Sequence, residues 1–321
     1  MIQSFDQLLA HAAGVPPKRV AVVNPANAET FEAIRDAQKA LRVSFLLAGD
    51  ATAIAAGLAG AGADASRTDI RHYADTKDAL KGAIEAVCHG EAEILMKGGV
   101  DTSAMMKMVL EEKSGLRTGR LLSDIFVLEY PPRGGNKFVM ITDGGITLAP
   151  DLKNKVELIA NAVEVAHALG NFLPKVAILS ATEFVVPNMQ STLDAAALAK
   201  MSDRGQITGC VVDGPFALDN AISDDAAAEK RIKSEVAGKA EILVAANIES
   251  ANCLAKSTTY FAGLRLAHVI VGGKVPILIP SRADKSDAKL LSVALGIIMS
   301  EYAAGHSPVV YGPVVYGPSG T

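Results

Sequence analysis

The chain has no tryptophan, only three cysteines and few aromatic residues, which make up 5% of its 321 residues. Cys88, Cys210 and Cys253 lie far apart, so they form neither a disulfide framework nor a CxxC metal site. Its formal net charge is −4, whereas nucleic-acid-binding proteins usually carry a basic excess. A basic leader followed by an apolar run is absent, and no apolar run approaches the ~20 residues of a membrane span. We therefore expect a compact cytoplasmic protein that binds neither nucleic acid nor membrane.

Common catalytic signatures are also missing. The sequence contains no GxGxxG, GxxxxGK[ST] or GxSxG pattern, so dinucleotide, P-loop and hydrolase-elbow motifs are excluded. Its six histidines are scattered, and none has a partner at the spacing of a helical metal site. We expect no structural metal.

What the chain does contain is an alternation of short β-branched runs with longer Ala-rich amphipathic stretches. Continuous apolar strands separated by helices are typical of a parallel sheet covered on both faces, so the predicted fold class is α/β. The expected strands are Arg19–Val23, Ser44–Ala48, Ala92–Met96, Phe126–Leu128, Phe138–Thr142, Val176–Ser180, Gly209–Val212, Ile242–Ala246, Ala267–Val271 and Val275–Ile279. The expected helices are Ala28–Leu41, Thr76–His89, Ser103–Glu112, Lys155–Leu169, Ser191–Lys200, Asp224–Val236 and Glu249–Phe261, with a further amphipathic helix after Lys289.

The segment Ser114–Gly145 interrupts this alternation because it is rich in Gly and Pro. It holds two strand-like runs, Phe126–Tyr130 and Phe138–Thr142, with no helix between them, and we expect a hairpin and a crossing between domains there. A second crossing is expected near Gly272. The tail after it repeats the sequence VVYGP twice, and its Pro and Gly content predicts a tail without regular structure. The predicted parts are a first domain from 1–125 and 272–305, a second domain from 126–271, and a tail from 306–321.

Ligands of open α/β sheets bind at the carboxyl ends of the strands, and four such junctions carry polar residues. At the first, Lys97, Gly98 and Gly99 precede a helix that Thr102 and Ser103 begin. A lysine beside backbone N–H groups at a helix start suits a phosphate. An ordinary strand–turn–helix with a solvated lysine explains the same residues and is favoured when this motif stands alone.

At the second junction, Asp143 and Gly144 follow an apolar strand. Asp143 can orient a basic ligand-binding side chain, but Asp-Gly is a common turn dipeptide, and the turn is the better explanation by itself.

At the third junction, Asp213 ends a buried strand, Gly214 and Pro215 impose a turn, and Asp219 is expected to return toward Asp213. Two such carboxylates can position a cationic group or a ligand hydroxyl. A turn capped by Asp213 is an equally good explanation.

The fourth junction is the most polar. Ser281 and Arg282 follow the strand Val275–Ile279, and Asp284 and Asp287 come directly after them. Arg282 can donate two hydrogen bonds to a phosphate, Ser281 can donate to a developing anion, and an Asp can accept a proton. Capping of the next helix by Asp284 and Asp287 explains the acids but not Ser281 and Arg282, so we favour a functional site.

Taken in order, these motifs resemble the phosphate acetyltransferase/phosphate butyryltransferase family from about residue 20 to residue 302. The resemblance implies a two-domain α/β fold, similar to the isocitrate and isopropylmalate dehydrogenases, with a cleft between the domains. It also implies a homodimer or larger assembly that moves an acyl group between coenzyme A and inorganic phosphate. Coenzyme A is then a substrate, and no metal or permanently bound cofactor is expected. The residues that carry the resemblance are Lys97-Gly98-Gly99, Thr102-Ser103, Thr142-Asp143-Gly144-Gly145, Val212-Asp213-Gly214-Pro215, Asp219, Ala246-Asn247, Asn252, Lys256 and Ser281-Arg282-Ala283-Asp284.

The resemblance also implies roles for individual residues. Arg282 is expected to bind the phosphate and Ser281 to stabilise the thiolate or the oxyanion, with Asp284 preferred to Asp287 as the base. The acetyl branch has an Asp seven residues after this Ser, where this chain has Ala288, so the pattern is closer to the butyryl branch. The expected phosphate-binding group is Arg282, Lys97, Thr102 and Ser103. The expected coenzyme A and cleft-lining group is Asp143, Gly144, Asp213, Gly214, Pro215, Asp219, Asn252 and Lys256.

Two other functions remain open on the sequence. A sensor that binds acyl-coenzyme A or acyl phosphate without catalysis is compatible with Ala288 and with Tyr260, which stands where the acetyl branch has a basic residue. A metal-dependent decarboxylating dehydrogenase shares the implied fold, but that chemistry requires clustered carboxylates and arginines, and we find no such cluster.

Overall fold

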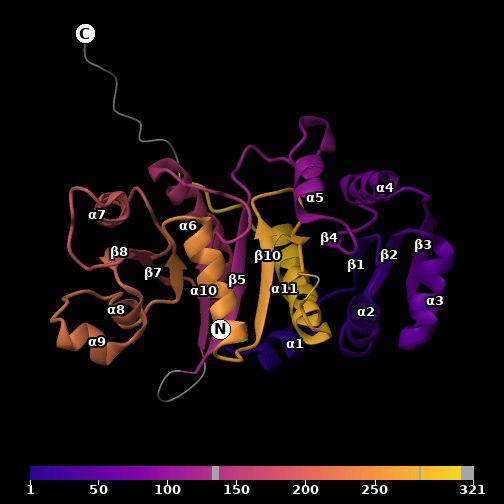
Figure 1. Cartoon of the computed structure of the whole chain (residues 1–321), viewed down its shortest axis with the longest axis horizontal. Helices are drawn as coiled ribbons and strands as arrows, with labels where there is room; N and C mark the ends of the chain where they lie inside the picture. Colours follow the sequence, from indigo (N-terminus) through magenta and orange to yellow (C-terminus); the bar gives the residue numbers. More distant parts are fainter. Residues whose placement is uncertain (132–136, 282, 312–321) are drawn as a thin grey trace, which may run out of the picture. The chain divides into compact units, whose positions relative to one another are not determined.

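The structure, a computed structural model, describes residues 1–131, 137–281 and 283–311 of the chain (Figure 1). Arg282, the expected hairpin turn at 132–136 and the second copy of the tail repeat lie outside the described residues.

The chain divides into two compact units. The first unit consists of Ile2–Asn136 and Leu264–His306, and the second of Lys137–Gly263 with Met1 and Ser307–Thr321. The boundaries therefore fall about ten residues from those expected at 126 and 272. The physical reason is that strands β5 (Ser123–Tyr130) and β10 (Leu266–Val271) pair with each other along their length.

The sheet of the first unit has the strand order β3-β2-β1-β4-β11-β10-β5. Neighbours from β3 to β11 run parallel, while β10 is antiparallel to both β11 and β5. Residues 20–23 of β1 and 45–49 of β2 are buried without interruption, as expected of strands with both faces covered. The remaining strands of this unit are β1 (Lys18–Val23), β2 (Val43–Gly49), β3 (Thr68–His72), β4 (Ile94–Lys97) and β11 (Ile277–Leu278).

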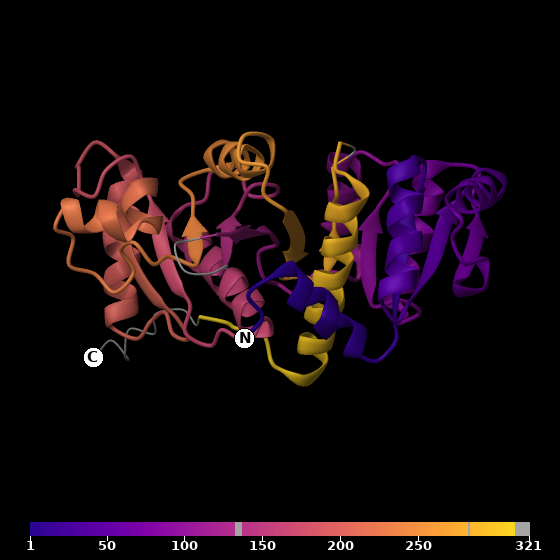
Figure 2. The same ribbon diagram turned by 90° about the horizontal axis from the view of Figure 1, so that it is seen from below.

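Helices from both ends of the chain form one layer of the first unit. Figure 2 shows α1, α2 and α11 side by side, and α11 also packs against β10. Helix α11 is long and apolar enough to cross a membrane by length and composition, but 61% of its apolar window is buried inside the protein. The helices of this unit are α1 (Phe5–Gly14), α2 (Ala28–Ala40), α3 (Ala51–Ala61), α4 (Thr76–Cys88), α5 (Thr102–Val109) and α11 (Ser286–Gly305), with 3₁₀ turns η1 (Ala65–Arg67) and η2 (Glu112–Ser114).

The second unit has the parallel strand order β6-β9-β7-β8. A buried ion pair joins two of its helices, because Lys155 Nζ lies 2.5 Å from Asp194 Oδ2 and both side chains are almost inaccessible. The strands are β6 (Lys137–Thr142), β7 (Lys175–Leu179), β8 (Val211–Phe216) and β9 (Ile242–Val244). The helices are α6 (Leu152–Ala168), α7 (Gln190–Asp203), α8 (Leu218–Ile222), α9 (Asp224–Glu229) and α10 (Ile248–Tyr260).

The described part of the tail lies on the second unit without regular structure. The Tyr311 hydroxyl donates a hydrogen bond of 2.6 Å to the backbone oxygen of Thr208 and lies 3.7 Å from Cys210 Sγ. Burial raises the pKa of the Cys210 thiol to about 11, so this cysteine is a packed thiol and not a nucleophile.

Candidate active site

A cavity of about 420 Å³ lies in the first unit, where the neighbouring strands β1, β4 and β11 end. This is the edge at which α/β sheets bind ligands. It brings together Lys97 and Ser281, which the sequence analysis identified in two separate motifs. The residues that line it are Ala26, Asn27, Thr30, Lys97, Gly98, Gly99, Pro280, Ser281 and Lys289.

The two glycines after β4 line the cavity, and their N–H groups form hydrogen bonds to backbone oxygens. Gly98 N–H donates to Val23 O at 2.9 Å, and Gly99 N–H donates to Asn24 O at 2.6 Å. A Cβ on Gly98 would lie 2.3 Å from Val23 O, so the position accommodates no side chain. Both N–H groups already donate to the end of β1 and the connection that follows it. Positive charge in the cavity is therefore supplied by side chains.

Lys97 is the buried side chain at the end of β4, with 4% of its surface exposed. Thr102 and Ser103, two of the residues predicted to act with it, do not line the cavity. Helix α5 begins at Thr102, one residue before the expected Ser103, and its N-cap is Asp101. Thr102 is half-buried and Ser103 is exposed.

Two hydrogen bonds join Ser281 to Asp284. The backbone N–H of Ser281 donates to the Asp284 carboxylate at 2.7 Å, and Asp284 N–H donates back to Ser281 O at 3.1 Å. Helix α11 has Lys285 as its N-cap with no side-chain cap bond, so Asp284 does not form the capping box that was the alternative explanation. The carboxylate of Asp284 is held beside a serine that lines the cavity.

Asp287, the second candidate base, is held in an ion pair. Its two oxygens accept hydrogen bonds from Arg265 Nε and Nη2 at 3.2 and 3.1 Å, and Arg265 also contacts Asp6 at 3.1 Å. Hydrogen bonding to Asp287 is the main reason that the pKa of Arg265 is raised. Asp287 thus fastens α11 to α1, and Asp284 is the acid beside the cavity.

Lys289 is a cavity residue to which sequence reasoning gave no role. It lies in the first turn of α11, is 2% exposed and donates a hydrogen bond to the backbone oxygen of Asp284. One signal was available: Lys289, Ser292 and Gly296 share a face of the helix by their spacing. A Cβ on Gly296 would contact Leu278 of β11, so this face lies on the sheet.

In the second unit, the structure brings together Asp143, Gly144 and Asn252. The Asp143 carboxylate accepts hydrogen bonds of 2.8–3.1 Å from the backbone N–H groups of residues 145–147. Asn252 Nδ2 of α10 donates to Gly144 O at 2.9 Å. Asp143 therefore organises the loop after β6, as the turn interpretation predicted, and Asn252 joins that loop to α10.

Asp213, Gly214 and Pro215 lie inside strand β8, which continues to Phe216; we expected the strand to end at Val212. The strand continues because Phe216 pairs with Leu179 of β7; a Cβ on Gly214 would lie 2.9 Å from Ile178 O of that strand. The pairing with β7 is irregular at this point.

Among the described residues, the carboxylates of Asp213 and Asp219 share no hydrogen-bond partner. Asp219 instead lies 3.1 Å from Lys230 Nζ, and its hydrogen bond with Lys230 holds its pKa below the usual range. Lys256 lies exposed on α10.

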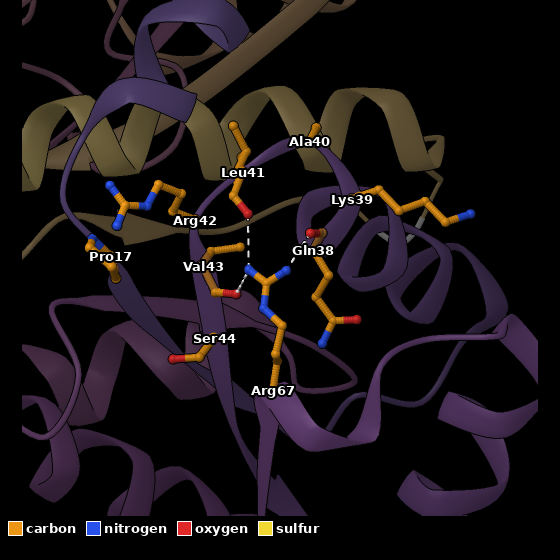
Figure 3. Close-up of a pocket in the computed structure, with 9 residues that line it drawn as sticks. All are labelled: Pro17, Gln38, Lys39, Ala40, Leu41, Arg42, Val43, Ser44 and Arg67. Carbon is orange, nitrogen blue, oxygen red and sulfur yellow. Dashed lines mark hydrogen bonds between the residues drawn. The ribbon is translucent and has the colours of Figure 1, made fainter.

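A second cavity of about 520 Å³ lies where β1 and β2 begin (Figure 3). Its central group, the Arg67 guanidinium, donates to the backbone oxygens of Gln38, Leu41 and Val43. Those bonds hold the α2–β2 connection, so we interpret Arg67 as structural. The lining residues are Pro17, Gln38, Lys39, Ala40, Leu41, Arg42, Val43, Ser44 and Arg67.

Metal ligands are not clustered in the part of the chain that the structure describes. There, no group of three or more His, Cys, Asp or Glu side chains is arranged to hold a metal ion.

Comparison with known proteins places the chain in a family. The family model described as "Phosphate acetyl/butaryl transferase" matches residues 16–297. A phosphate butyryltransferase of Clostridium beijerinckii is 43% identical over 94% of this chain and 99% of its own length. A phosphate acetyltransferase of Thermotoga maritima is 46% identical over 70% of this chain and 76% of its own. A solved branched-chain phosphotransacylase from Enterococcus faecalis V583 has a TM-score of 0.79 at 30% identity and covers 88% of this chain and 99% of its own. With its cavity lined by Lys97, Ser281 and Lys289, the chain belongs to the phosphate acetyl/butyryl transferase family.

Proposed function

We propose that this protein transfers a short acyl group, acetyl or butyryl, between coenzyme A and inorganic phosphate. The observation that carries the proposal is the cavity at the ends of β1, β4 and β11, which combines buried lysines with a serine. Buried ammonium groups in a cavity favour a small anion such as phosphate. Family membership supplies the acyl and thiol partners. Action in the cytoplasm and assembly as a homo-oligomer belong to the same proposal.

The proposed mechanism is direct transfer within a complex of enzyme and both substrates. In the direction that consumes acyl phosphate, Asp284 takes the thiol proton of coenzyme A and the thiolate attacks the acyl carbonyl. The new C–S bond replaces the C–O bond to phosphate, and Arg282 and Lys97 hold the departing phosphate. Ser281 stabilises the thiolate or the oxyanion. Holding both substrates makes the reaction effectively unimolecular, which lowers the barrier by several kcal/mol, at most about 7–11 kcal/mol.

Of the two candidate bases, the geometry supports Asp284. Its carboxylate is fixed by Ser281, which lines the cavity, whereas both Asp287 oxygens are engaged by Arg265. We also propose that coenzyme A contacts Asp143, Gly144 and Asn252. The hydrogen bonds that join these residues into one ordered loop of the second unit support this role.

The test is phosphate-dependent release of coenzyme A from acetyl-, propionyl- and butyryl-coenzyme A, followed with a thiol reagent. We expect release with all three, because one methylene changes specificity only about 10- to 200-fold. Coenzyme A binding without any phosphate-dependent release would contradict the proposal and favour a sensor.

The variant Arg282→Ala extends this test. Because the guanidinium is proposed to bind the phosphate, its removal should lower turnover by about 10²-fold or more, while circular dichroism and the unfolding temperature stay unchanged. Turnover close to that of the wild type would show that Arg282 is not the phosphate ligand.

A further inference from the structure

Lys289 is a buried lysine at the cavity that forms no ion pair with the carboxylates of the described residues. Its side chain is 2% exposed and lines the cavity with Lys97 and Ser281. Within the described ranges, its single hydrogen-bond partner is the backbone oxygen of Asp284, and it forms no ion pair. Taking an ammonium group out of water without a counter-ion is strongly unfavourable. A bound anion would therefore stabilise the charged form of Lys289 at this position.

A comparison inside the same protein supports this point. Lys155 is buried to a similar degree in the second unit, and there the fold supplies Asp194, whose oxygen lies 2.5 Å from Lys155 Nζ. This buried lysine has its charge matched by a carboxylate of the fold. Lys289 differs because it faces a cavity large enough to admit a ligand.

The charges around Lys289 agree with an incoming anion. Burial lowers the pKa of Lys289, and the nearby Asp284 and Glu29 only partly oppose this effect. A bound anion would offset the cost of burial. An ammonium group has three N–H donors, and Asp284 O takes one of them, which leaves two for the oxygens of a ligand.

We propose that Lys289 and Lys97 together bind the phosphoryl group, Lys289 being a substrate ligand that contacts the phosphate oxygens directly. This inference rests on the proposed function. A phosphate dianion meets two positive charges from two elements, the end of β4 and the first turn of α11. Because Lys289 also bonds Asp284 O, phosphate bound there holds Asp284 in place beside Ser281.

Three variants distinguish a role of Lys289 in phosphate binding from a role in stabilising the fold. Lys289→Gln keeps a donor for Asp284 O and removes the charge, Lys289→Arg keeps the charge, and Lys81→Met is the control because Lys81 lies exposed on α4. The measurements are the KM for inorganic phosphate, the KM for acyl-coenzyme A, and the rise in unfolding temperature caused by inorganic phosphate alone.

For Lys289→Gln we expect the KM for phosphate to rise about 10- to 100-fold, which is the effect of losing a hydrogen bond to a charged group. The KM for acyl-coenzyme A should stay unchanged, and the thermal stabilisation by phosphate should be lost. Lys289→Arg should restore most of both phosphate effects, and Lys81→Met should behave as the wild type.

A wild-type KM for phosphate and a wild-type thermal shift in Lys289→Gln would overturn the proposal and leave Lys289 a structural role. If Lys289→Gln does not fold, Lys289→Arg provides the test. Inorganic phosphate must then raise the unfolding temperature of Lys289→Arg as it does for the wild type, and the absence of this rise would overturn the proposal. If the wild type shows no acyl transfer, the proposed function fails, but phosphate stabilisation of the wild type and its loss in Lys289→Gln still decide this inference.

Discussion

Two carboxylates three positions apart differ in what surrounds them. Asp284 accepts a hydrogen bond from the backbone of Ser281 at the cavity. Asp287 forms a two-bond contact with Arg265 and is half exposed. A base must be able to reach a proton on the substrate, and a carboxylate with both oxygens engaged by a guanidinium is poorly placed to do so. This difference in surroundings is the reason that Asp284 is the proposed base.

The variants Asp284→Asn and Asp287→Asn form a matched pair. An amide at 284 still accepts the Ser281 bond but cannot take a proton, so we expect kcat to fall about 10²- to 10⁴-fold. An amide at 287 weakens an exposed ion pair, so we expect near-normal kcat and a stability loss of at most about 1 kcal/mol. Steady-state kinetics and urea unfolding measure both effects. The reverse order of kcat losses would exchange the two roles.

Residue by residue, the sequence could identify the polar groups but not which of them are buried. Lys97 and Ser281 follow apolar strands, and the rule that ligands bind at strand ends was enough to select them. Lys289 was missed because a lysine in a helix is ordinarily solvated, and only the packing of α11 makes it inaccessible. The roles of Gly98 and Gly99 depend on how close the β1–α2 connection lies, which no local pattern contains.

At the scale of elements, the close contact between the glycines after β4 and the end of β1 controls the shape of the cavity. A Cβ on Gly98 would meet the backbone oxygens of Val23 and Asn24 at 2.3 and 2.7 Å. Backbone atoms cannot move aside as a flexible side chain can, so a methyl group there displaces the connection.

We expect Gly98→Ala to destabilise the protein by about 1–3 kcal/mol, as overpacking does, and to weaken phosphate binding. The matched control is Gly60→Ala on α3, where an added Cβ has no neighbour within 4 Å; it should stabilise by about 0.5–1 kcal/mol. Thermal unfolding measures both changes. A stable Gly98→Ala variant would show that the β1–α2 connection tolerates the displacement.

Elements with strong apolar patterns were predictable, and elements without them were not. All ten expected strands overlap observed ones. The edge strand β3, with the sequence TDIRH, was missed because it has no buried face. Helix α3 was missed because its Ala and Gly residues give no polar and apolar sides, although Asp50 caps one end and Gly62 ends the other with φ +68°. The antiparallel direction of β10 depends on its pairing with β11 and above all with β5, which lies far away in sequence.

At the scale of the whole molecule, the two units differ in whether the segments that form them are continuous in sequence. The body of the second unit is one continuous stretch, Lys137–Gly263. The first unit needs Leu264–His306 as well, because β11 lies between β4 and β10 and α11 covers the sheet beside α2. Its hydrophobic core is therefore incomplete in the first 136 residues.

Because the first unit is built from two stretches separated by the second unit, we expect the second unit to fold first during translation. When the opening third of the nascent chain emerges, β4 can pair with β1 but lacks its second neighbour, β11, until the stretch after it has been translated. Pairing between strands far apart in sequence is slow, because the chain loses the entropy of loop closure before the stabilising contacts form. In pulse-labelling hydrogen exchange during refolding, we expect amides of β7 and β9 to gain protection before those of β4 and β11. Earlier protection of β4 and β11 would show that the late-synthesised strand is not what limits maturation.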